Sequence, residues 1–372
     1  MITSDQLAAI QDCVTNRLDP ERLRARWLCA VIGDGPSTYS RSPALWNAAF
    51  RALGLDATYV ALDVRRERLG DFFAALRACG GFLGVNVTVP YKIEALAYLD
   101  EIDPGAQRIG AVNTIVRDPA SGRLVGFNTD GAGFVESILT PQPGRTRPFV
   151  ESLDGARILL IGAGGSARAL AFHLSDRLGE GELVIANRTE SQARALAGDI
   201  RGTGRRARAI DESGIADFAP HADLIVNATT KGQSGLRKLP DGRLVDLEPY
   251  SALAPARPVP CTEAEWANPE LREAWRAAAR ADIEANHRAS RAVAGSVPPG
   301  TGFCDIIYHP EETVFLRHGR ETGHRTMNGK AMIVCQAAIA LRDHVCKREL
   351  AALSKADPAS YRRILETMYA AW

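Results

Sequence analysis

A lysine and two polar side chains near one predicted strand end are the first candidates for chemistry. Asn86 and Thr88 are two positions apart in a β-rich run over residues 81–89, so an extended strand would present both on one face. Pro90 stops strand pairing and suits a first helical turn, which predicts that Lys92 lies at a strand-to-helix junction on the rim of a sheet. Such a lysine can act as a catalyst, although on this segment alone a solvated surface lysine is the commoner case.

A glycine-rich loop is the second candidate. An apolar strand predicted over residues 156–161 runs directly into a loop with three glycines, and a helix is predicted immediately after it. Glycines let the backbone turn tightly and bring amide N–H groups against a pyrophosphate at the positive end of the helix. We therefore expect a dinucleotide there, bound by Gly162, Ala163, Gly164, Gly165, Ser166 and Ala167.

The next strand end indicates which dinucleotide is bound. A strand predicted over residues 182–186 ends about 20 residues after the glycine loop, where the ribose should lie. An NAD-binding domain would offer Asp or Glu there, but this chain has Arg188, whose guanidinium suits a 2′-phosphate. The sequence therefore favours NADP over NAD. Further cofactor contacts are expected at Asn187, Thr189, Ala228 and Thr229, at the ends of predicted strands.

The elements that must position these residues alternate between strand and helix. The first domain is predicted to contain strands near residues 27–33, 58–63 and 81–89 and helices over 4–26, 43–53 and 69–78. A hairpin over 111–117 and 122–128, followed by a helix that begins close to Asp130, completes it. This alternation favours a parallel or mostly parallel sheet, with ligands collected beyond the carboxyl ends of its strands.

The length of 372 residues suits two domains. We predict a mixed or mostly parallel α/β substrate domain from residues 1–139 and about 325–372, so that the C-terminal helices return to it. A Rossmann-type domain is predicted over residues 156–324, after a proline-containing linker at 140–155. An insertion at about 240–300 holds a charged helix, Pro269 to Ala294, that is expected to be solvated, or to serve as a lid or subunit contact.

Composition excludes several classes of function. There are 45 Lys and Arg residues against 44 Asp and Glu, without a long charged block, so nucleic acid and membrane surfaces are not expected partners. The seven cysteines include no C-x-x-C pair, so neither a disulfide framework nor a metal site is indicated, and the thiols are expected to be reduced. No apolar run reaches membrane-spanning length and no secretory signal is present, which predicts a cytoplasmic protein.

The combined motifs resemble those of the shikimate dehydrogenase family, from about Val31 to Leu341. The segment Ser40-Arg41-Ser42-Pro43 is similar to the family's paired-serine loop, and residues 86–92 are similar to its N-x-T-x-P-x-K segment. Two more family motifs are similar to residues 111–114 and 128–130. The resemblance implies a substrate site formed by Ser40, Ser42, Asn86, Thr88, Asn113, Tyr308 and Gln336, with Lys92 and Asp130 as catalytic residues.

The reaction implied by this resemblance is NADP-dependent interconversion of 3-dehydroshikimate and shikimate, or of a close carboxylated cyclitol. Ser40 and Ser42 would hold the carboxylate, and the amide side chains would bind the ring hydroxyls. Lys92, oriented by Asp130, would either carry the proton or stabilise the charge on the oxygen. Met332 would lie beside the nicotinamide, and a homodimer is possible.

Some residues depart from the family pattern. Lys330 and Ala331 replace an apolar residue and a glycine before Met332, and Tyr39 replaces a histidine. Gln192 stands where a second phosphate-binding basic residue is common, with Arg194 as a possible substitute. These changes leave a quinate or aminoshikimate-type dehydrogenase as an alternative. Two other readings remain open: a non-catalytic ligand sensor on the same fold, and a folate-linked or amino-acid dehydrogenase of similar architecture.

Overall fold

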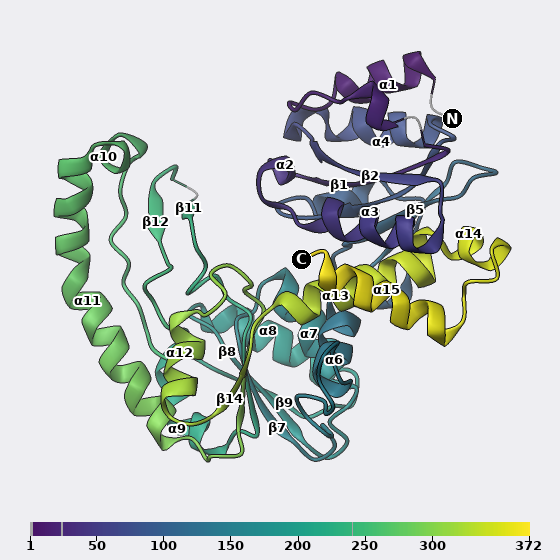
Figure 1. Cartoon of the computed structure of the whole chain (residues 1–372). Coiled ribbons are helices and arrows are strands. Elements are labelled where there is room, and N and C mark those ends of the chain that lie inside the picture. The colour runs from purple at the N-terminus through teal and green to yellow at the C-terminus, as the bar shows by residue number, and fades with distance from the viewer. Residues whose placement is uncertain (1–2, 24, 240) are drawn as a thin grey trace. The chain divides into compact units, whose positions relative to one another are not determined.

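The structure, a computed structural model, describes residues 3–23, 25–239 and 241–372, which form two compact α/β units (Figure 1). Unit 1 contains the chain up to Ser137 together with Gln142–Thr146 and Met332–Trp372. Unit 2 contains Ile138–Pro141 and Arg147–Ala331. The return to unit 1 therefore comes after residue 331 and not near residue 325, because residues 325–327 pair with the sheet of unit 2.

Unit 1 is built on a mixed six-stranded sheet. Its strands lie in the order β2 (Ala57–Asp63), β1 (Trp27–Gly33), β3 (Phe82–Val87), β5 (Thr114–Arg117), β6 (Leu124–Phe127) and β4 (Glu101–Ile102). The β1 strand is parallel to β2 and β3, whereas β5 is antiparallel to both of its neighbours. The carboxyl ends of β1 and β3 therefore meet at one edge, where the Thr88 amide donates to the Ile32 carbonyl over 2.9 Å.

Helices cover both faces of this sheet (Figure 1). On one face α1 (Ser4–Gln11) and α4 (Leu69–Ala78) pack over a core that includes Phe72, Phe82 and Ile115. On the other face lie α3 (Ser42–Leu53), α13 (Lys330–Ile339) and α15 (Pro358–Ala370). The remaining helices of unit 1 are α2 (Pro36–Tyr39), α5 (Pro104–Ile109), α6 (Asp130–Leu139), which ends in unit 2, and α14 (Lys347–Ala352). The C-terminal chain thus completes the second core of the unit.

The N-terminal helix is shorter than predicted. It ends at Gln11, and a separate 3₁₀ turn covers Pro20–Leu23. Between them the chain docks on the end of β2, because Asn16 donates to the Ala61 carbonyl over 2.9 Å and accepts from the Asp63 amide over 2.8 Å. These contacts replace helical hydrogen bonds, and the periodicity of the sequence did not reveal them.

The segment after β3 is not the helix that Pro90 suggested. Residues 90–93 form a turn, and a 3₁₀ helix follows at Glu94–Tyr98. The turn is fixed from outside: the buried Tyr91 hydroxyl donates to the Val64 carbonyl over 2.8 Å, and the Lys92 carbonyl accepts from the Val112 amide over 2.9 Å. Lys92 thus lies beyond a strand end, as expected, but on a turn that tertiary contacts hold.

Unit 2 contains a six-stranded sheet whose pairings are all parallel. The order is β14 (Arg325–Met327), β13 (Gly302–Asp305), β10 (Leu224–Asn227), β7 (Arg157–Ile161), β8 (Glu182–Ala186) and β9 (Ala207–Ile210). The helices outside the insertion are α7 (Gly165–Ser175), α8 (Glu190–Arg201), α9 (Ile215–Phe218) and α12 (Val314–Glu321). This is the strand order of a doubly wound dinucleotide-binding domain, whose crevice lies beyond β7 and β10.

The predicted insertion lies between β10 and β13. It forms an antiparallel pair, β11 (Leu236–Lys238) and β12 (Leu244–Asp246), followed by α10 (Glu263–Ala267) and α11 (Pro269–Ser296). As predicted, α11 begins after an Asn268 N-cap with proline at its first position. The helix is not wholly solvated, however, because Asn286 is buried and its side-chain amide donates to the Ser251, Ala254 and Pro255 carbonyls.

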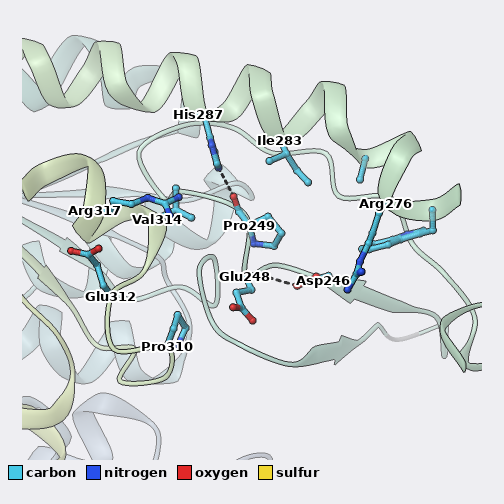
Figure 2. A pocket seen from close by; sticks show the side chains of 12 residues that line it. Asp246, Glu248, Pro249, Arg276, Ile283, His287, Pro310, Glu312, Val314 and Arg317 are labelled. Carbon is cyan, nitrogen blue, oxygen red and sulfur yellow. Dashed lines mark hydrogen bonds between the residues drawn. The ribbon is translucent and has the colours of Figure 1, made fainter. Parts of the chain in front are cut away.

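A pocket of about 570 Å³ separates α11 from β12 and the start of α12 (Figure 2). Figure 2 shows Arg317 and Arg276 on different sides of it, with Ile283 of α11 between them. One wall is fixed by His287, whose Nε2 lies 2.7 Å from the Pro249 carbonyl. The lining contains none of the predicted site residues.

Among the helices in the described ranges, none is long and apolar enough to cross a membrane.

Candidate active site

Lys92 and Asp130 form an ion pair beyond the ends of β3 and β6. Lys92 Nζ lies 2.6 Å from Asp130 Oδ2, and the side chains are 22% and 7% exposed, respectively. Asp130 is the first residue of α6, where the positive end of the helix dipole stabilises a carboxylate. Its amide donates to Asn128 Oδ1 over 3.1 Å, so Asn128 is a turn residue. The pair presents one ammonium group to solvent and keeps its counter-ion buried.

Asn113 holds the other side of this carboxylate. Its Nδ2 donates to Asp130 Oδ1 over 2.7 Å and lies within 3.2 Å of Gln336 Oε1. Its Oδ1 accepts from the Thr129 amide over 2.8 Å and from the Thr114 hydroxyl over 3.0 Å. A buried amide with this many partners is rigid. In this structure Asn113 therefore fixes Asp130 and links it to Gln336.

Asn86 extends the same network to β2. It is buried, and its Nδ2 donates to the Asn113 carbonyl over 3.2 Å and to the Thr114 hydroxyl over 3.0 Å. Its Oδ1 accepts from the hydroxyl of Tyr59 over 2.7 Å. Sequence reasoning missed Tyr59, because an aromatic residue in a strand of apolar neighbours is usually a core residue. Burial raises the pKa of Tyr59 well above its usual range, so this hydroxyl keeps its proton.

The paired serines lie at the start of the helix that holds Tyr59. Ser42 is the first residue of α3, whose Asn47 hydrogen-bonds the Tyr59 backbone, and the Ser42 amide donates to Ser40 Oγ over 3.2 Å. Thr88 is held close by because β1 ends in Gly33: a Cβ at Gly33 would lie 2.5 Å from Thr88 Cγ2. Both serines and Thr88 are half-buried and accessible to a ligand.

The structure therefore brings most of the predicted unit 1 residues together. Asn86, Asn113, Asp130, Lys92 and Gln336 form one continuous chain of hydrogen bonds. Ser40 and Ser42 are joined to each other at the start of α3. Two residues lie elsewhere. Tyr308 follows β13 in unit 2, whereas Met332 is buried in the part of α13 that belongs to unit 1.

The glycine loop of unit 2 has the backbone geometry that a dinucleotide needs. Gly162 has φ +119°, and a Cβ there would lie 2.8 Å from the Ala228 carbonyl oxygen, so the loop needs glycine for a close backbone approach. Around Gly164 and Gly165 a Cβ would meet no atom within 4 Å, so the space above the loop is open. Gly164 provides no side-chain cap to α7. The first-turn amides of this helix can therefore donate to a phosphate.

The end of β8 fits NADP. Arg188 is exposed, and none of the hydrogen bonds or ion pairs found among the described residues involves its guanidinium. Asn187 is engaged, because its Nδ2 donates to the Thr189 carbonyl and to Gln192 Oε1. Arg194, the possible substitute, pairs with Glu190 at 2.8 Å. Arg188 is therefore the residue that would meet a 2′-phosphate.

Buried charges stabilise the loop after β10, and no motif in the sequence identified their partners. Lys231 Nζ lies 2.7 Å from Glu212 Oε1, and burial lowers its pKa against the opposing effect of that carboxylate. Asn227 Nδ2 lies 3.1 Å from both carboxylate oxygens of Asp305, and its Oδ1 accepts from the Thr229 hydroxyl over 2.7 Å. These contacts fix the backbone of Ala228 against Gly162.

In the described part of the chain, no group of His, Cys, Asp or Glu is arranged to hold a metal ion.

Comparison with known proteins agrees with this geometry. A family model described as the shikimate dehydrogenase substrate binding domain matches residues 31–115, and one described as shikimate / quinate 5-dehydrogenase matches residues 146–238. A shikimate dehydrogenase (NADP(+)) of Symbiobacterium thermophilum is 36% identical over 332 residues, which cover 88% of this chain and 91% of that protein.

Solved structures show the same fold. Shikimate 5-dehydrogenase of Thermus thermophilus, in complex with NADP(H) and shikimate, gives a TM-score of 0.62 at 30% identity, covering 93% of this chain and 100% of the other. Quinate dehydrogenase of Corynebacterium glutamicum, in complex with NAD, gives 0.64 at 28% identity, covering 92% and 99%. Because identity above 30% extends over most of the chain and the folds agree, this chain belongs to the shikimate dehydrogenase family.

Proposed function

We propose that this protein is an NADP-dependent oxidoreductase that interconverts 3-dehydroshikimate and shikimate. The observation that carries the proposal is the Lys92 and Asp130 ion pair, linked through Asn113 to Asn86 and Gln336. The site combines hydroxyl donors for a carboxylate, polar groups for ring hydroxyls and a charged proton donor. Relatives named shikimate dehydrogenase (NADP(+)) support the same substrate and cofactor.

Unit 1 binds the ring acid in this proposal. Ser40 and Ser42 donate to the carboxylate, whereas Thr88 and Gln336 contact ring hydroxyls. Asn113 keeps the Asp130 carboxylate in place, and Asp130 in turn orients the Lys92 ammonium. Tyr308 is also assigned to the substrate in this proposal.

Unit 2 binds NADP in this proposal. The first turn of α7 donates to the pyrophosphate, and Arg188 pairs with the 2′-phosphate. The loop residues Ala228 and Thr229, and Met332 from α13, are assigned to the same cofactor. The bound nicotinamide supplies or accepts the hydride.

In the direction of reduction, the Lys92 ammonium donates a proton to the substrate oxygen as the ring carbonyl becomes an alcohol. The resulting amine is reprotonated from solvent, which reaches the 22% exposed side chain. Asp130 is held in place by Asn113 and keeps the Nζ atom within reach of the substrate oxygen. Oxidation runs through the same residues in reverse.

The proposal also covers cell compartment and assembly. We assign the enzyme to the cytoplasm, which the absence of a disulfide among its seven buried cysteines supports, and we include a homodimer as the assembly to be tested. Light scattering of the purified protein measures its mass directly, and a monomer would contradict the dimer.

A steady-state assay that follows the absorbance of the reduced nicotinamide cofactor tests the function. Purified protein is given shikimate, quinate and an amino analogue, each with NADP and with NAD. We expect the highest kcat/KM for shikimate with NADP. A higher value for quinate or the amino analogue would reassign the substrate, and no turnover of any acid would reject the enzyme class.

A further inference from the structure

Tyr59 occupies a position between two parts of the substrate site that are distant in sequence. It lies in β2, next to Cys29 of β1 in the register of the sheet, and its side chain is 2% exposed. Its hydroxyl donates to Asn86 Oδ1 over 2.7 Å. One residue thus contacts the strand that leads to Lys92 through its hydroxyl and the helix that begins at Ser42 through its backbone.

The ring that carries this hydroxyl is held in one orientation. It stacks on Trp46, with centroids 4.7 Å apart and planes at 29°. The backbone on both sides is clamped by Asn47, whose Nδ2 donates to the Tyr59 carbonyl over 2.8 Å and whose Oδ1 accepts from the Tyr59 amide over 2.9 Å. Trp46 and Asn47 belong to α3, the helix that begins at Ser42. The serine loop and the tyrosine therefore form one rigid assembly.

The hydroxyl also determines what Asn86 can offer to a ligand. The two Nδ2 hydrogens of Asn86 are directed to the Asn113 carbonyl and the Thr114 hydroxyl. Its Oδ1 has two lone pairs, of which Tyr59 occupies one. What remains is a single acceptor. Asn86 can therefore receive a hydrogen bond from a ring hydroxyl, but it has no free N–H for a ring carbonyl.

We infer that Tyr59 is a positioning residue for the substrate site: its hydroxyl orients the Asn86 amide as an acceptor for a hydroxyl of the ring acid. Tyr59 does not touch the substrate itself. Without its hydroxyl, Asn86 Oδ1 loses its donor and the amide can rotate. The inference rests on the proposed function, because the ligand is the ring acid assigned there.

Tyr59→Phe tests this role, because it removes the hydroxyl and keeps the ring stacked on Trp46. We expect kcat/KM for the ring acid to fall about 10- to 100-fold, mostly through KM, as for the loss of hydrogen bonds in a buried site. The KM for NADP should stay within about twofold, because the cofactor residues belong to other elements. The matched control is Tyr369→Phe, which removes a hydroxyl that donates to Gln142 over 2.8 Å in the same unit.

A double-mutant cycle separates positioning from general destabilisation. If Tyr59 acts through Asn86, Tyr59→Phe should cost less than about threefold in kcat/KM when Asn86 is already alanine. Independent, multiplicative losses in the two variants would overturn the role, as would an equal loss in Tyr369→Phe.

Crystal structures without ligand provide a readout that does not depend on turnover. In Tyr59→Phe we expect the Asn86 amide to leave Thr114. If the Asn86 side chain keeps its wild-type position, the inference is rejected. If the wild type oxidises no ring acid, the proposed function fails, and this comparison still decides the role of Tyr59.

Discussion

Lys92 Nζ lies 2.6 Å from Asp130 Oδ2, and the carboxylate is the more buried partner, with 7% of its side chain exposed against 22% for the lysine. The acid is held from its other oxygen by Asn113 at 2.7 Å. The ammonium is therefore the adjustable member of the pair. It can approach a ligand while its counter-ion stays in place.

Replacing Lys92 with methionine removes the proton donor while keeping an unbranched side chain. We expect kcat to fall by about 10²- to 10⁴-fold, the usual contribution of a positioned acid or base, with a smaller change in KM. Steady-state kinetics in both directions measure the loss. Lys347→Met, at an exposed position of unit 1, is the control and should match the wild type. A Lys92→Met enzyme with full kcat would exclude Lys92 from the proton transfer.

Arg188→Ala should change cofactor preference more than catalysis. A hydrogen bond to a charged group contributes about 1.5–3 kcal/mol, so kcat/KM for NADP should fall about 10- to 100-fold. The value for NAD should change little, because NAD lacks the 2′-phosphate. Arg194→Ala serves as the control, since that side chain already pairs with Glu190. A similar loss in both arginine variants, or an equal loss for both cofactors, would contradict the assignment.

Gly162→Ala should disrupt the phosphate loop. The backbone there has φ +119°, and the new Cβ would lie 2.8 Å from the Ala228 carbonyl oxygen. We expect a stability loss of about 1–3 kcal/mol from the strained backbone, together with a large increase in the Kd for NADP. Gly235→Ala is the control that measures backbone strain without a steric clash. Gly235 has φ +92°, and an added methyl group there would meet no atom within 4 Å. Retained NADP affinity in Gly162→Ala would argue against the close approach.

Asp305 should make the stability of unit 2 depend on pH. Burial raises the pKa of Asp305 to about 7, compared with about 3.9 in an unfolded chain. The folded state therefore binds more protons than the unfolded state between these values, so this residue's contribution to stability falls as pH rises from about 4 to about 7. Denaturant unfolding at several pH values should show a flatter dependence for Asp305→Asn. An unchanged slope would mean that Asp305 is ionised in the folded protein at low pH.

The sequence predicted the two sheets well because their strands are short apolar runs that end in recognisable turns. It placed Asn86 on a strand and Lys92 beyond the end of that strand, and the structure agrees. The predicted helix at Pro90 was wrong because Tyr91 anchors that turn to Val64, a contact 27 residues away in sequence. Local patterns contain no information on such a contact.

The side-chain partners within the site were harder to predict. Asn113 was expected to bind the ring, whereas in the structure its amide is occupied by Asp130, Thr129 and Gln336. Tyr59 was missed because a tyrosine in a strand is usually part of the core, and only the fold shows that its hydroxyl lies beside Asn86. Motifs thus identified the residues that carry charge, but not the neutral side chains that orient them.

The anchoring of Asn286 has a consequence for how the insertion could have been acquired or lost. The C-terminal half of α11 contributes Ser290, Val293 and Ala294 to the buried interior, whereas the part before Ala279 is mostly exposed. Excising the whole helix would therefore open the interior of unit 2. Length can vary only at the outer end, before Ala279, so related chains with shorter insertions should retain the inner turns of this helix.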